Sequence, residues 1–104
     1  MIRIQIDAGQ NLQARVDELF AAVTQKARVW RISDRRRKRY LEMTHAARNV
    51  RGTVRRVDLK DEDHLSFECH ARDQVQEAIT AGRFVHLVLR HSPTATTILV
   101  ERRK

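Results

Sequence analysis

Hydrophobic and polar residues alternate along several short stretches of this chain, which is the pattern of half-buried β-strands. Residues 2–6 and 65–70 have it most clearly, with an apolar side chain at every second position. The same alternation, or a short apolar run, predicts the other strands, which are expected at 27–32, 39–45, 50–59, 84–89 and 96–100. A wholly polar stretch separates 50–59 from 65–70, so these two strands are expected to form a hairpin.

The strand expected at 50–59 has two unusual features. Val50 and Val54 share one face with Gly52, and a glycine inside a strand indicates a bend or the close approach of another backbone. The later apolar residues of this strand have the opposite parity. If all of these residues are buried, a β-bulge is expected near Arg55 and Arg56.

Apolar residues at helical spacing predict two helices. The first covers about 10–26 and presents an ordinary core-facing stripe. The second is expected at 71–81, with Gly82 as the residue that ends it. The residues expected on the buried face of this second helix are Val75, Ala78 and Ile79.

The stretch 33–48 is compatible with two structures. A loop at 33–38 followed by a strand at 39–45 is favoured over a helix at 34–48. Five adjacent cations, residues 35–39, repel one another, and such a helix has little apolar surface to bury. In the favoured structure Met43 points into the core and Glu42 points outward.

Two helices and six or seven strands joined mostly by hairpins define an α+β protein. We expect a mostly antiparallel sheet, or a partly closed small barrel, with two helices packed on it. The 104 residues form a single domain, 1–104. A chain of this size buries roughly 65% of the surface that it exposes when unfolded, which is enough for one modest core.

Charge is unevenly distributed along the chain. The net charge is +8, but residues 26–56 hold twelve Lys/Arg and only two acids, whereas residues 57–79 carry a net charge of −5. All but two of the twelve cations are arginines, which bind phosphates through two parallel hydrogen bonds. This segregation predicts one strongly positive face.

The sequence therefore favours a non-catalytic nucleic-acid-binding module, with RNA or a ribonucleoprotein preferred over a defined DNA site. Few aromatic residues are available for base stacking, and Trp30 is expected in the core, so phosphate contacts are expected to dominate. On the hairpin, Thr53 is expected to share an outward face with two of the arginines. The predicted binding residues are Arg28, Arg31, Arg35, Arg36, Arg37, Lys38, Arg39, Tyr40, Arg51, Arg55 and Arg56.

The main alternative is an interaction or assembly protein. Its basic face would dock an acidic partner, or the apolar edge at 98–100 would join subunits into a homo-oligomer. Membrane binding through the basic segment ranks lower, because the chain has no basic amphipathic helix and no lipidation motif.

Enzymatic chemistry is not predicted. The histidines and the single cysteine show no metal-binding spacing, and Cys69 fits the core side of its strand. The acids at 58–63 are typical of a solvated turn, and three scattered glycines cannot form a phosphate-binding loop. We therefore expect no catalytic residues, no metal and no cofactor.

Arg35 and Arg39 have an RxxxR spacing that resembles the dinucleotide-binding start of PilZ domains. The second motif of that family, a D/N-x-S-x-x-G turn, is missing, because residues 49–52 supply neither its serine nor its spacing. A PilZ-type dinucleotide site is therefore not favoured.

A cytoplasmic location is expected. One cysteine is typical of a reducing compartment, no apolar run approaches the roughly 20 residues of a membrane helix, and the first residues do not resemble a secretory signal.

Overall fold

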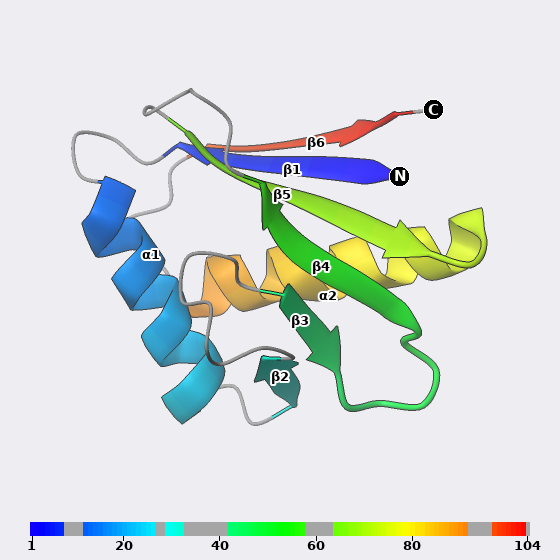
Figure 1. Cartoon of the computed structure of the whole chain (residues 1–104), viewed down its shortest axis with the longest axis horizontal. Helices are drawn as coiled ribbons and strands as arrows, with labels where there is room; N and C mark the ends of the chain where they lie inside the picture. The colour runs from blue at the N-terminus through cyan, green and yellow to red at the C-terminus, as the bar shows by residue number, and fades with distance from the viewer. Residues whose placement is uncertain (8–11, 27–28, 33–41, 58–63, 92–96, 104) are drawn as a thin grey trace.

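The computed structural model describes residues 1–7, 12–26, 29–32, 42–57, 64–91 and 97–103. Its elements, in chain order, are β1 (Ile2–Asp7), α1 (Leu12–Ala21), a π-helical turn η1 (Ala22–Lys26), β2 (Trp30–Ile32), β3 (Glu42–His45), β4 (Gly52–Val57), β5 (His64–Ala71), α2 (Gln74–His91) and β6 (Ile98–Arg102). The six strands form one sheet, and the two helices lie on the same side of it (Figure 1). The expected α+β class is confirmed.

The order of strands in the sheet is β2-β3-β4-β5-β1-β6, and every neighbouring pair is antiparallel. β2 and β6 stand at the two edges, so the sheet is open rather than the partly closed barrel that was the other expectation. β1 lies between β5 and β6, which brings the two ends of the described chain together. The backbone N–H of Arg103 donates to the carbonyl of Met1 at 2.8 Å.

The first helix matches its prediction from residue 12 onward. Val16, Leu19 and Val23 are buried on its core side, and Phe20 packs partly against the same cluster. The last turn, Ala22–Lys26, winds as a π-helix instead of continuing as an α-helix.

The second helix is longer than predicted and replaces a strand. α2 continues through Gly82 and through residues 84–89, so both the predicted stop and the predicted strand are wrong. The predicted buried face is also wrong, since Val75 is 67% exposed and Ala78 is exposed. The residues that α2 buries recur every three or four positions: Glu77, Thr80, Ala81, Phe84, Leu87 and Val88.

The start of α2 has a side-chain cap. The carboxylate of Asp73 accepts a hydrogen bond from the backbone N–H of Gln76 at 2.8 Å, which satisfies one of the free donors of the first turn. The amide oxygen of Gln76 in turn accepts the backbone N–H of Arg51 at 2.9 Å, tying the helix start to the residue before β4.

β3 and β4 settle two other expectations. Residues 42–45 are a strand, with Met43 fully buried, so the helix alternative at 34–48 is wrong for this part of it. The loop expected at 33–38 lies outside the described residues. β4 pairs with β5 without interruption from Gly52 to Val57, so no bulge forms near Arg55 and Arg56. The bulge was expected only if all the apolar residues were buried, and Val57 is only partly buried.

The core lies between the helices and one face of the sheet. Phe67 and Phe84 are both fully buried, with ring centroids 4.7 Å apart, and Trp30 meets Phe84 edge-on at 6.0 Å. Trp30 and Cys69 were both expected in the core, and the structure confirms both.

Candidate nucleic-acid interface

Most of the predicted binding residues lie outside the described residues; these are Arg28, Arg35, Arg36, Arg37, Lys38, Arg39 and Tyr40. The strands on either side of segment 33–41 are nevertheless defined. Ile32 comes just before this segment and Met43 comes two residues after its end. The two residues are directly paired across β2 and β3. Both ends of the arginine-rich segment are therefore fixed at one end of the β2–β3 pair.

Four of the predicted binding arginines are described, and two of them, Arg31 and Arg55, lie on the face of the sheet opposite both helices, here called the open face. Both arginines are exposed. Arg31 follows the buried Trp30 and Arg55 follows the buried Val54, so each arginine points away from the core. Thr53 shares the outward side of β4 with Arg55, as the sequence predicted. β2 and β4 both pair with β3, so only one strand separates the two arginines.

The other two predicted binding arginines that the structure describes, Arg51 and Arg56, are placed differently. Arg51 is exposed just before β4, and its Nε donates to the carbonyl of Arg48 at 3.2 Å. Arg56 is paired with Phe67 and is only partly exposed, so it lies on the helix side of the sheet. The structure therefore separates Arg56 from the open face.

The strand register arranges the open face in rows of directly opposed residues. One row consists of Arg31, Thr44, Thr53 and His70. The next row consists of Glu42, Arg55, Glu68, Arg3 and Glu101. The second row alternates in charge at every step, and opposite charges on directly opposed strand positions stabilise a sheet.

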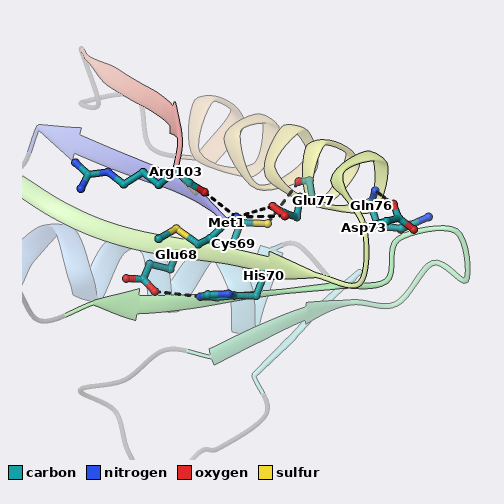
Figure 2. A network of polar contacts seen from close by, with 8 residues as sticks. All are labelled: Met1, Glu68, Cys69, His70, Asp73, Gln76, Glu77 and Arg103. Atoms are coloured by element: carbon teal, nitrogen blue, oxygen red, sulfur yellow. Dashed lines mark hydrogen bonds and ion pairs between the residues drawn. The ribbon is translucent and has the colours of Figure 1, made fainter.

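Glu68 connects the two rows. Its carboxylate accepts from Arg3 Nη2 at 3.3 Å and lies 3.0 Å from Nε2 of His70, the contact drawn in Figure 2. The hydrogen bond from His70 is the main cause that lowers the pKa of Glu68, and Arg3 adds to it against the opposing effect of burial. Glu68 therefore stays ionised and fixes the imidazole of His70.

A shallow pocket of about 290 Å³ opens on this face. The described residues that line it come from three neighbouring strands: Glu42, Thr53, Arg55 and His70. The alternation along one hairpin strand predicts Thr53 and Arg55 as outward-facing residues. It does not link them to Glu42 and His70, because that requires the registers of β3 and β5 against β4.

A second polar network lies around the start of α2 (Figure 2). The amino group of Met1 forms an ion pair with the buried carboxylate of Glu77 at 2.9 Å, and Cys69 Sγ donates to the Glu77 carbonyl at 3.5 Å. Burial, together with the charge of Glu77, raises the pKa of the Cys69 thiol to about 12. A thiol that stays protonated is neither a nucleophile nor a metal ligand at neutral pH.

Within the residues that the structure describes, no group of three or more His, Cys, Asp or Glu side chains is placed to hold a metal ion. The acids at 58, 61, 62 and 63 lie outside them. No described helix is long and apolar enough to cross a membrane.

Comparisons with protein-family models, with curated proteins and with solved structures give no significant match to this chain.

Proposed function

We propose that this protein is a non-catalytic nucleic-acid-binding module that binds RNA, or a ribonucleoprotein, through the open face and the arginine-rich segment, residues 33–41. The observation that carries this proposal is the direct pairing of Ile32 with Met43. It holds the two ends of a segment with five consecutive cations on neighbouring strands of the sheet. Glu42 is the first described residue after that segment, and its direct partner across the sheet is the exposed Arg55.

The five consecutive cations of the arginine-rich segment suit phosphate binding. Each cation that meets a phosphate releases condensed counterions, and the affinity does not depend on the base sequence. A segment anchored at both ends also loses less conformational entropy on binding than a free basic tail does. The hydroxyls of Thr44 and Thr53 offer further donors to phosphate or ribose on the same face.

RNA is favoured over a specific duplex DNA site. The exposed face that carries Arg31 and Arg55 is a sheet, and the described helices cover its other side (Figure 1). Neither described helix is therefore presented beside these arginines for insertion into a major groove. A cytoplasmic location belongs to this proposal and rests on the single cysteine.

The test is salt-dependent binding to a structured RNA hairpin, measured by fluorescence anisotropy between 50 and 400 mM salt, roughly the range in which counterion release dominates. Replacing Arg35, Arg36 and Arg37 by alanine is expected to weaken binding to every RNA and to reduce the salt slope by about 2–3. The matched control replaces three exposed arginines elsewhere, Arg83, Arg90 and Arg102, with the same loss of charge. If the Arg35, Arg36 and Arg37 variant binds RNA as tightly as wild type, the proposal is contradicted. If the control variant loses as much RNA affinity, the binding reflects only the net charge of the protein.

A second candidate is self-assembly through β6. Leu99 and Val100 are 52% and 49% exposed on the two sides of this edge strand, and β1 occupies only one of its hydrogen-bonding edges. Two copies that pair their β6 edges in antiparallel fashion would satisfy both edges and bury these side chains. Sedimentation equilibrium tests this: we expect a dimer that Val100→Lys dissociates, whereas a wild-type monomer at high concentration contradicts it.

The same candidate class includes an acidic protein that docks on the basic face. Such a partner would compete with RNA for Arg31 and Arg55. The salt titration is therefore run with RNA and with an acidic polypeptide, and the two affinities are compared. Affinity for a generic acidic polypeptide that equals the affinity for RNA would favour the protein partner.

A further inference from the structure

The pocket on the open face carries both a negative and a positive side chain. Glu42 and Arg55 are directly opposed across β3 and β4, and both line it. In the part of the chain that the structure describes, neither forms an ion pair, with the other or with a third residue. The pocket thus offers a carboxylate that accepts hydrogen bonds beside a guanidinium that donates them.

The two remaining lining residues add an ordered ring and a hydroxyl. His70 is held through Nε2 by Glu68 at 3.0 Å, so its imidazole is oriented before any ligand arrives. Thr53 is directly opposed to His70 across β4 and β5. A planar ring fixed at the rim of a polar pocket is a surface on which a nucleobase can stack.

These properties do not fit a phosphate group. Glu42 would repel an anion placed next to Arg55, and its two carboxylate oxygens would find no donor on a phosphate diester. They do fit a neutral, planar guest with donors on one edge and acceptors on another. A volume of about 290 Å³ is at the lower limit for small-molecule sites, which suits one base rather than a paired helix.

We propose that this pocket holds one unpaired guanine base of the bound RNA. This inference rests on the proposed function and names the base that the open face prefers. Glu42 accepts the two adjacent N–H donors of the Watson–Crick edge, N1–H and the N2 amino group. Arg55 donates to the acceptor edge formed by O6 and N7, the pairing by which arginine commonly recognises guanine.

The other bases lack this combination. Adenine and cytosine each present one amino donor next to a ring-nitrogen acceptor, which would face the second oxygen of Glu42. Uracil presents a single N–H between two carbonyls. Only guanine offers a carboxylate two parallel donors, so the pocket discriminates by leaving the wrong base with unpaired or repelled groups.

The experiment measures binding of the full chain to the heptamer UUUGUUU and to versions with adenosine, cytidine or inosine at the central position. Guanosine is expected to bind about tenfold tighter than adenosine, the usual size of one good bidentate contact. Inosine, which lacks only the N2 amino group, is expected to lose about half of that preference on a logarithmic scale. Because the change is made in the ligand, its effect does not depend on how a variant folds.

The matching protein variant is Glu42→Gln, which keeps the shape of the side chain but replaces one acceptor oxygen by a donor. It is expected to abolish the preference for guanosine while leaving the salt slope unchanged. Glu101→Gln is its control, since Glu101 stands in the same row of the open face but outside the pocket. The Glu101 variant is expected to retain the full preference.

The outcomes separate this inference from the proposed function. Salt-dependent binding with equal affinity for all four heptamers overturns the guanine pocket and leaves nucleic-acid binding intact. If the structured hairpin binds but no heptamer does, the guanine pocket is overturned and the proposed function stands. If neither the hairpin nor any heptamer binds, the proposed function fails, and a titration with free guanosine monophosphate tests the pocket alone. Amide shifts at Thr53 and His70 in that titration support a free-nucleotide site, and their absence overturns the pocket as well.

Discussion

Gly52 lies directly against Thr80, and this contact sets the distance between α2 and the sheet. A Cβ atom at position 52 would stand 2.7 Å from Cβ of Thr80 and 2.8 Å from its Cγ2, closer than side chains approach one another. Thr80 is fully buried in the middle of the core-facing side of α2. The helix therefore packs on β4 at a position where only a glycine leaves room.

Gly52→Ala is expected to destabilise the protein by about 1–3 kcal/mol, because the added methyl group overpacks a close contact between a strand and a helix. The measurement is the urea midpoint at constant m-value. The loss is expected in thermal unfolding as well. Gly52→Ala with wild-type stability would contradict the close packing of α2 on β4.

Gly82→Ala is the matched control, with the opposite expected sign. Gly82 is exposed on α2, and a Cβ built there meets nothing within 4 Å. Alanine in a helix interior is more favourable than glycine by about 0.5–1 kcal/mol, so this variant is expected to be more stable than wild type. Destabilisation would indicate that the helix ends near Gly82, as the sequence alone suggested.

The two glycines differ in how far the sequence predicted their roles in the fold. Gly52 interrupts an alternating strand, and that local signal predicted either a bend or the close approach of another backbone. The structure shows a close approach, made by the side chain of Thr80. Gly82 has the position of a typical helix stop, but tertiary packing overrides that signal because Phe84, Leu87 and Val88 continue the buried stripe. The stripe was hidden because its first members, Glu77 and Thr80, are polar.

The candidate site was predictable only in part. The parity of residues along β4 correctly placed Thr53 and Arg55 outward. The pocket also requires Glu42 and His70, which are separated by 27 residues of sequence and meet only through two strand registers. Register depends on pairing energies summed over whole strands and on turn geometry, so alternation within one strand does not reveal it.

Phe84 and His86 provide a test of the helical segment that replaced the predicted strand. In a strand the two residues would share a face, whereas in α2 Phe84 is fully buried and His86 is exposed. Phe84→Ala is expected to cost about 3–5 kcal/mol in unfolding free energy. His86→Ala is expected to change it by less than about 0.5 kcal/mol. Comparable losses from the two substitutions would contradict the helix.

Cys69 is expected to resist thiol reagents in the native state. Its side chain is fully buried and donates to the carbonyl of Glu77, and burial raises its pKa to about 12. At pH 8 a disulfide reagent is therefore expected to react with less than one thiol per folded molecule in the time that it takes to react completely with the urea-unfolded protein. Rapid labelling of the folded protein would show that the region between β5 and α2 opens.

His45 is expected to make stability depend on pH. Burial is the main cause that lowers its pKa below 6.5, the charge of Arg83 adds to it, and Nδ1 of the neutral ring accepts the backbone N–H of Ala47 at 3.0 Å. Above pH 6.5 the ring is neutral in both the folded and the unfolded protein, so its contribution is constant. As the pH falls from there to the lowered pKa, the unfolded chain binds a proton that the folded chain excludes, and stability decreases.

The measurement for His45 is the urea midpoint at pH 7.5 and at pH 5.0 for wild type and for His45→Gln. Glutamine keeps an acceptor for Ala47 but does not titrate, so the variant is expected to lose less stability between the two pH values. The other histidines are the same in both proteins, so the comparison isolates His45. Arg83→Gln is expected to reduce part of the stability loss between pH 7.5 and pH 5.0. The variant removes the charge that disfavours the imidazolium of His45, while the burial of the ring remains. Identical pH profiles for wild type and His45→Gln would mean that the ring is as accessible to protons in the folded protein as in the unfolded one.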